Sequence, residues 1–151
     1  MEIISKPIGR VINSRKEPID DNWSEIISEI ELMEHIPEES LNGIETFSHI
    51  EIVFYFDKID LSKISFAGHP RGNKDYPYTG IFAQRKKERP NGIGLCIAEL
   101  IKHNGKRLMV KRLDAIDGTP VIDIKPVFKE FLPSGEIKQP AWTNDLMKNY
   151  W

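Results

Sequence analysis

Residues 94–113, GLCIAELIKHNGKRLMVKRL, contain the pattern that sets the fold class. Two apolar runs, Gly94 to His103 and Lys106 to Leu113, are joined by Asn104-Gly105. An Asn-Gly pair between alternating hydrophobic runs is the strongest short-range signal for a β-hairpin. The stretch therefore predicts two paired antiparallel strands.

Apolar runs on both sides of this hairpin predict additional strands. His49 to Phe56 is rich in β-branched and aromatic residues and predicts a buried strand. Ile3 to Val11, with a Pro suited to a sheet edge, and Val121 to Ile124 predict two more. Trp23 to Leu32 predicts a strand with some helical character. Six or seven strands separated by turn signals favour a mainly β fold, an antiparallel barrel or sandwich.

The segments between the strands contain little helix. Pro37 to Gly43 predicts one or two helical turns, and Ala141 to Tyr150 predicts a short helix with Thr143 as its cap. Asp60 to Thr79 has no periodicity and predicts a long loop, which in a small domain is usually functional or mobile. A Rossmann fold is disfavoured, because no βαβ alternation occurs and Gly92-Ile-Gly94 opens a strand instead of a helix.

The bulk properties of the 151-residue chain indicate one domain, since an apolar share of 40% is enough for a single core. No apolar run approaches the roughly 18 residues of a membrane span, and the first ten residues lack a signal-peptide pattern. We therefore expect a cytoplasmic protein with no membrane partner. Cys96 is the only cysteine, which excludes an intramolecular disulfide and favours a buried thiol without chemistry.

The net charge of −2 hides an uneven distribution. Residues 1–68 hold 6 Lys and Arg against 14 Asp and Glu, whereas residues 69–112 hold 11 against 3. The basic middle third is suited to a polyanion such as RNA. A set of solvated lysines on hairpin edges would produce the same count.

Metal and triad chemistry are disfavoured. The four histidines, at positions 35, 49, 69 and 103, form no i, i+4 pair and have no Cys partner, so no usual zinc spacing is met. No nucleophile elbow is present either. We expect no metal.

Two segments carry residues suited to a ligand, and the first is 85–94. Pro90 restricts Arg89 to extended geometry, while the glycines that follow permit unusual torsions or a close backbone approach. Asn91 offers both a donor and an acceptor, which suits the edge of a nucleobase. The alternative is a tight turn in which Asn91 only satisfies backbone groups.

The second segment is 113–125, where Asp114, Asp117 and Asp123 surround a Gly-Thr-Pro turn. Such carboxylates suit a ribose hydroxyl, a cationic group or an arginine from the first segment. The alternatives are a local turn role for Asp117 and a structural ion pair between Asp123 and an arginine.

Six motifs occur together and in order: PIGRV (7–11), LNGIETFSHI (41–50), HPRGN (69–73), GIFAQR (80–85), RPNGIG (89–94) and LDAIDGTPVIDIKP (113–126). Together they resemble the TsaA-like (TrmO-like) family. The resemblance implies a small β-barrel over residues 1–130 that binds S-adenosylmethionine, forms a homodimer, and methylates N6 of threonylcarbamoyladenosine beside the tRNA anticodon. Residues 131–151 would then be a tail whose short helix packs on the barrel or on the dimer partner, which would cover its aromatic end.

The resemblance also implies residue roles. Catalysis is expected of Asp114 or Asp117 as base and of Arg85 or Arg89 as a stabiliser of developing charge on the carbonyl oxygen. Residues expected to bind the cofactor are Phe82, Ala83, Gln84, Arg85, Arg89, Pro90, Asn91, Ile93, Asp117, Gly118, Thr119 and Pro120. Residues expected to contact RNA or substrate are His69, Arg71, Asn73, Lys74, Lys86 and Lys87. Two other readings stay open: a methyltransferase for a small molecule or peptide, and a non-catalytic module that senses the cofactor.

Overall fold

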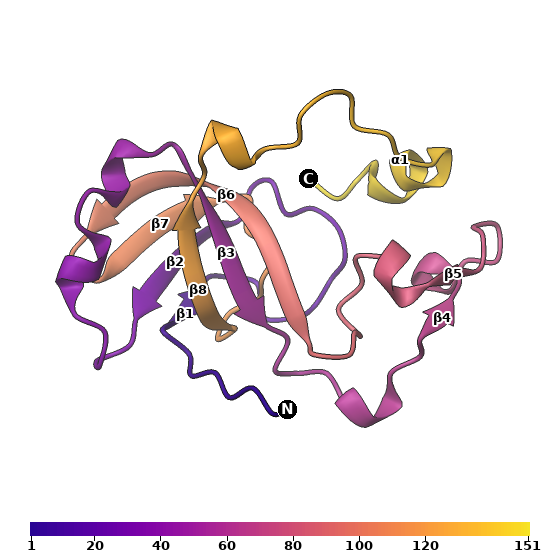
Figure 1. Ribbon diagram of the computed structural model, residues 1–151, viewed down its shortest axis with the longest axis horizontal. Helices are drawn as coiled ribbons and strands as arrows, with labels where there is room; N and C mark the ends of the chain where they lie inside the picture. The colour runs from indigo at the N-terminus through magenta and orange to yellow at the C-terminus, as the bar shows by residue number, and fades with distance from the viewer.

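A closed β-barrel forms the main body of the computed structural model, which describes residues 1–151 (Figure 1). Six antiparallel strands close it in the order β1-β2-β7-β6-β3-β8. Their bounds are β1 Gly9–Ile12, β2 Ile27–Leu32, β3 His49–Tyr55, β6 Ile93–Asn104, β7 Arg107–Lys111 and β8 Pro120–Pro126. The predicted mainly β antiparallel barrel is confirmed.

The predicted hairpin is β6–β7, but its turn lies one residue later than the Asn-Gly pair. Asn104 pairs with Arg107, so the two turn residues are Gly105 and Lys106. Of these only Gly105 has a positive φ, at 58°. A glycine at the first turn position is what a type II′ hairpin turn requires, which explains the shift.

Alternation along the strands builds the core. Ile50, Ile52 and Phe54 of β3 are at most 1% exposed and face Leu108 and Val110 of β7, which are fully buried, as parts of one hydrophobic cluster. Each such side chain stabilises the fold by about 1.5–3 kcal/mol. The intervening β3 residues point outward, as a closed barrel requires.

Two predicted strands are shorter than expected, and one predicted cap is wrong. β1 begins at Gly9 because Ile3 and Ile4, which are 86% and 81% exposed, have no neighbouring strand. β2 begins at Ile27 because a turn closed by the Ile26 N–H and the Trp23 carbonyl precedes it. Thr143 does not cap its helix, since its hydroxyl donates backward to the Pro140 carbonyl.

The predicted helical turns at 37–43 are a 3-10 helix, Glu38–Leu41, followed by a second one at Ile44–Thr46. The predicted loop at 60–79 contains two short 3-10 helices, Leu61–Lys63 and Pro70–Gly72. Its strand β4 (Ala67–Gly68) lies between them and pairs with β5 (Thr79–Gly80) at the end of the loop. Two further 3-10 turns are Ile81–Ala83 and Lys129–Phe131.

The C-terminal tail runs from the barrel to helix α1, Ala141–Met147, and then returns (Figure 1). α1 lies beside the β4–β5 ribbon, where the Tyr76 hydroxyl donates to Asp145 at 2.6 Å and the rings of Tyr76 and Trp142 are 5.9 Å apart. The last residues pack on the chain's own barrel end. None of the helices has the length and apolar character that a membrane crossing requires.

Candidate functional site

The two segments singled out from the sequence lie at the same end of the barrel. Gly94 of β6 and Val121 of β8 both pair with Phe54, near the end of β3. The loop before β6 and the turn before β8 therefore flank that strand end. The corner at Asp114 lies beside the same stretch of β6, because the Cys96 thiol donates to the Arg112 carbonyl at 3.1 Å and Arg85 of the first segment donates to the neighbouring Leu95 carbonyl.

Side chains of the 84–89 loop hold its backbone closed. Arg89 donates through Nη1 to the carbonyls of Gln84, at 3.1 Å, and Lys86, at 3.4 Å. Gln84 is 8% exposed, and its amide donates to the carbonyls of residues 68 and 79 at 3.0 Å each. Arg85 Nη2 donates to the Leu95 carbonyl at 2.8 Å. Gln84 and Arg89 therefore shape the loop.

The two glycines of the loop are required for different reasons, Gly92 by its backbone torsion and Gly94 by packing on β3. Gly92 has a φ of 58°, a conformation that favours glycine. A Cβ at Gly94 would lie 2.3 Å from Cε2 of Phe54, so only glycine fits there. The side chains that the loop leaves open are those of Phe82 and Ile93, at 80% and 48% exposed, and Asn91, which forms no side-chain hydrogen bond.

Asp117 is fully engaged within the chain. Lys16 Nζ lies 2.5 Å from one carboxylate oxygen, and the Asn13 N–H donates to the other at 3.0 Å. The hydrogen bond from Lys16, followed by that from Asn13, lowers the pKa of Asp117 below its ordinary value. The alternative of a local turn role for the Asp117 side chain is wrong, because its partners are Asn13 and Lys16, more than 100 positions away. Through these two bonds Asp117 holds the adjoining turn, Gly118-Thr119-Pro120, in which Thr119 is 4% exposed.

Asp114 has a different environment. Its Oδ2 accepts a hydrogen bond from the Tyr150 hydroxyl, and its Oδ1 is buried with no partner. Burial first, and then the charge of Asp114, raise the pKa of both Tyr150 and the Cys96 thiol. Sequence reasoning missed Tyr150, since an aromatic residue 36 positions away carries no local signal of this contact.

The basic block is partly neutralised by the acidic first third of the chain. Arg71 donates to both carboxylate oxygens of Asp21, at 3.2 and 2.8 Å, and these bonds, followed by the charges of Asp21 and Asp20, act to raise the pKa of Arg71. Lys87 lies 3.4 Å from Asp20. Lys74 and Lys86 have no acidic partner within ion-pair distance.

The two remaining predicted substrate residues have local partners. The His69 ring nitrogen Nδ1 lies 2.7 Å from the Tyr76 carbonyl. The Asn73 amide oxygen accepts from the Asp75 N–H at 3.0 Å, which closes a turn. Both therefore order the loop that also presents Arg71 and Lys74.

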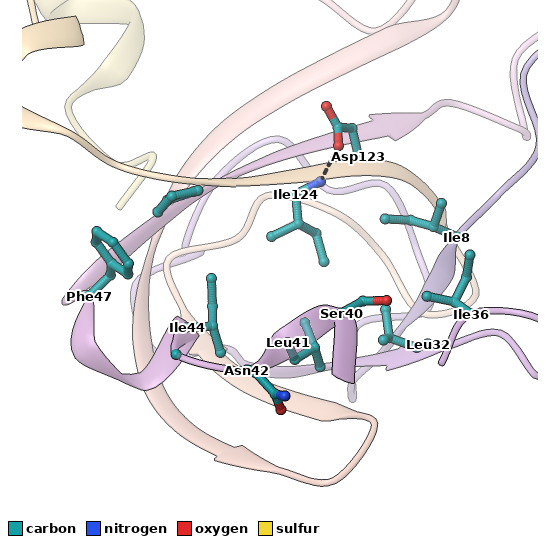
Figure 2. A pocket seen from close by; sticks show the side chains of 12 residues that line it. Ile8, Leu32, Ile36, Ser40, Leu41, Asn42, Ile44, Phe47, Asp123 and Ile124 are labelled. Carbon is teal, nitrogen blue, oxygen red and sulfur yellow. Dashed lines mark hydrogen bonds between the residues drawn. The ribbon is translucent and has the colours of Figure 1, made fainter. Parts of the chain in front are cut away.

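A cavity of about 490 Å³ lies at the other ends of β3 and β8 (Figure 2). Its wall is mainly aliphatic, and Ile124 faces Leu41 and Ile44 across it. Of the three aspartates noted in the sequence only Asp123 reaches it, and its ionic partner is Lys125 rather than an arginine. None of the predicted cofactor or substrate residues lines this cavity. No group of three His, Cys, Asp or Glu side chains has the arrangement of a metal site.

Residues 12–131 match the family model described as tRNA-methyltransferase O N-terminal domain. The chain belongs to this family. It is 40% identical over 114 residues to human tRNA (adenine(37)-N6)-methyltransferase, a match that covers 75% of this chain and 25% of the human protein. An S-adenosyl-L-methionine-binding protein of Archaeoglobus fulgidus is 37% identical over 127 residues, covering 82% of this chain and 88% of the relative.

A crystal structure of TrmO from Pseudomonas aeruginosa superposes with a TM-score of 0.75 at 26% identity, covering 94% of this chain and 62% of that one. The chain spans 30% of another Archaeoglobus fulgidus relative, a probable S-adenosyl-L-methionine-binding protein. Both candidate segments lie inside the region matched by the tRNA-methyltransferase O N-terminal domain. Tyr150, which binds Asp114, lies beyond it.

Proposed function

We propose that this chain is an S-adenosylmethionine-dependent methyltransferase that methylates N6 of threonylcarbamoyladenosine next to the tRNA anticodon. Family membership and the activity for which the human relative is named support the reaction class. The observation that carries the proposal is the convergence of the 82–94 loop, the 117–120 turn and the Asp114 corner at one barrel end. Because tRNA is used in the cytoplasm, the reaction would take place there.

The residues available at this end fit the proposed cofactor. The ring of Phe82 and the side chain of Ile93 offer apolar surface for an adenine, and the free amide of Asn91 offers both a donor and an acceptor for its edge. The wall of Gly118, Thr119 and Pro120 is held by Asp117.

The acceptor nitrogen is a weak nucleophile because its lone pair is delocalised into the carbamoyl group. The bound cofactor supplies an electrophilic methyl group, so the chain's own work is to orient the acceptor and remove its proton. Asp114 suits the base role better than Asp117, whose two oxygens are bonded and whose pKa is lowered. Arg85 uses one nitrogen on the Leu95 carbonyl and has further N–H groups for a developing oxyanion.

We also propose a homodimer, as the family resemblance implied. The outward face of β6 carries an apolar stripe, Ile93, Leu95, Ile97 and Ile101, each 44–48% exposed. Such a stripe on an exposed strand face is typical of a protein interface. It begins at Ile93, beside the cofactor loop, so a second copy seated on it would lie next to the site.

A charge placed in the stripe tests this dimer. We expect Leu95→Lys to shift the wild-type dimer toward monomer in sedimentation equilibrium, because a buried unpaired charge destabilises an interface strongly. Ser134→Lys, which adds the same charge at an exposed residue of the C-terminal tail outside the stripe, is the matched control. A monomeric wild-type chain, or a Leu95→Lys chain that dimerises as well as wild type, would contradict the proposed surface.

The methyl-transfer proposal is tested with labelled cofactor. Transfer of the label to tRNA that carries threonylcarbamoyladenosine, with the product nucleoside identified by mass spectrometry, would support it. The matched substrate is the same tRNA with unmodified adenosine, which should accept no label. No transfer to the modified tRNA at any protein concentration would overturn it.

A second function is favoured by one observation. Because Arg71 and Lys87 are neutralised by Asp20 and Asp21, part of the expected RNA surface is already occupied. A cofactor-binding module, or a methyltransferase with a small acceptor, needs no such surface. Cofactor binding by calorimetry without transfer to any RNA would support the module, and label found in small molecules or peptides would support the small acceptor.

A further inference from the structure

Residues 149–151 are held beside the candidate site by hydrogen bonds and a cation–π contact. The N–H groups of Asn22 and Trp23 donate to the carbonyls of residues 149 and 150, both at 2.9 Å. The guanidinium carbon of Arg112 lies 4.6 Å from the centre of the Trp151 ring. Tyr150, between these contacts, reaches Asp114. Two backbone hydrogen bonds and one cation–π contact therefore hold the tail end around the Tyr150–Asp114 hydrogen bond.

The hydrogen bond from Tyr150 is the only one that Asp114 receives on Oδ2, and it leaves Oδ1 as a buried acceptor without a partner. A buried carboxylate oxygen without a hydrogen bond is costly, and a catalytic role is one of the reasons for which proteins keep such a group. The phenol is partly buried, and its raised pKa keeps it protonated near neutral pH. It therefore acts on Asp114 as a permanent donor.

We propose that Tyr150 is a positioning residue of the methyl-transfer site, which orients Asp114 so that its free oxygen receives the acceptor's proton. The inference rests on the function proposed above. In that reaction the N6–CH3 bond forms as the S–CH3 bond breaks, and the N6 proton moves to Asp114. Tyr150 does not touch the reacting atoms. It fixes one carboxylate oxygen and thereby the direction of the other.

The position of Tyr150 makes this role specific to the C-terminal tail. The tail follows the residues matched by the family model, yet it reaches the corner through contacts with residues 22–23 and 112. The other end of the tail, helix α1, contacts Tyr76 near the predicted substrate loop. A single segment thus connects that loop to the acidic corner.

A double-mutant cycle tests the role. Tyr150→Phe keeps the ring and removes the donor, while Asp114→Asn keeps an acceptor for Tyr150 and removes the base. We expect cofactor affinity to stay within about threefold in each variant, and the single-turnover rate to fall roughly 10- to 100-fold in Tyr150→Phe and about 100-fold or more in Asp114→Asn. Because Tyr150 acts through Asp114, the double variant should be no slower than Asp114→Asn alone.

Tyr76→Phe is the matched control. It removes a Tyr–Asp hydrogen bond of the same kind from the same tail, at 2.6 Å, without contact to Asp114. We expect its rate to stay within about threefold of wild type if the tail is otherwise only an anchor. Thermal unfolding of every variant identifies a fold defect, and a rate lost together with the fold is assigned to structure.

The outcomes separate this inference from the function on which it rests. No transfer by the wild-type chain overturns both. Transfer by wild type that is unchanged in Tyr150→Phe overturns the role of Tyr150 alone. So does a double variant slowed by the product of the two single effects, because the two residues would then act independently. An equal loss in Tyr76→Phe and Tyr150→Phe would assign the effect to general tail anchoring and overturn it too.

Discussion

Gly94→Ala should destabilise the barrel, because the added methyl has no room against the core. An ideal Cβ at residue 94 would lie 2.3, 2.5 and 2.9 Å from three ring atoms of Phe54. Since carbon atoms normally approach to about 3.5–4.0 Å, the ring would have to move by roughly 1 Å or more. Phe54 is 1% exposed and packs edge-on against Phe56 at 5.3 Å, so it has no free space to move into.

The magnitude follows from two opposing effects. Overpacking a core costs about 1–3 kcal/mol, and the severe overlap places this site near the upper value. Replacing Gly by Ala also restricts the unfolded chain, which offsets about 0.4–1 kcal/mol. We therefore expect a loss of about 2 kcal/mol, which in a domain of this size lowers the unfolding midpoint by roughly 4–8 °C.

Thermal and urea unfolding followed by circular dichroism measure this loss. The matched control is Gly68→Ala, where no atom lies within 4 Å of the added Cβ and φ is not in the left-handed region. It should leave the midpoint unchanged within about 2 °C. Phe54→Leu in the Gly94→Ala background should recover part of the loss, because the smaller side chain leaves room. A Gly94→Ala chain as stable as wild type would refute the reasoning.

Four further variants have defined outcomes. Arg89→Ala should weaken cofactor binding about tenfold or more in calorimetry by opening the 84–89 loop, and Asn91→Ala should weaken it without any change in stability; unchanged affinity in folded chains would rule out the proposed loop. Asp117→Asn should lower the unfolding midpoint at pH 7. Because the pKa of Asp117 is depressed from its ordinary value of 3.8, the stabilisation is complete above that pH and is lost as the pH falls through the folded-state pKa, so the two midpoints should converge at still lower pH; a constant gap would contradict this. The double variant Asp20→Asn, Asp21→Asn should free Arg71 and Lys87, and steepen the dependence of log tRNA affinity on log salt by up to about 2 if both then meet phosphates; an unchanged slope in filter binding would show that they do not.

The fold class followed from local sequence patterns that do not depend on distant parts of the chain. The hairpin signal at Asn104-Gly105 and the β-branched and aromatic run at 49–56 are properties of short segments. The hairpin formed with its turn at Gly105-Lys106, and the predicted strand at 49–56 is β3. The element ends were less predictable. β1 is shorter than its apolar run because a strand needs a neighbour, and no local pattern shows that residues 3–7 extend past the last strand available for pairing.

The candidate site was also only partly predictable from the sequence. The motifs at 80–94 and 113–126 located both segments, because a turn built from Pro, Asn and Gly is visible in the sequence itself. The reason for the glycines was not visible. Gly94 is required by the ring of Phe54, which lies 40 positions earlier and approaches it only when β3 and β6 pair.

The sequence alone predicted the barrel, the family and the two segments. Local residue patterns indicated the strands, and the ordered motifs indicated the family and the segments. Tertiary structure alone paired Lys16 with Asp117, brought Asp20 and Asp21 onto the basic block, and seated Tyr150 on Asp114. Such contacts join residues tens of positions apart, and a side chain's partner depends on where the closed barrel places it. Charge and hydrogen-bonding capacity are encoded residue by residue, whereas the partner that satisfies them is a property of the folded chain.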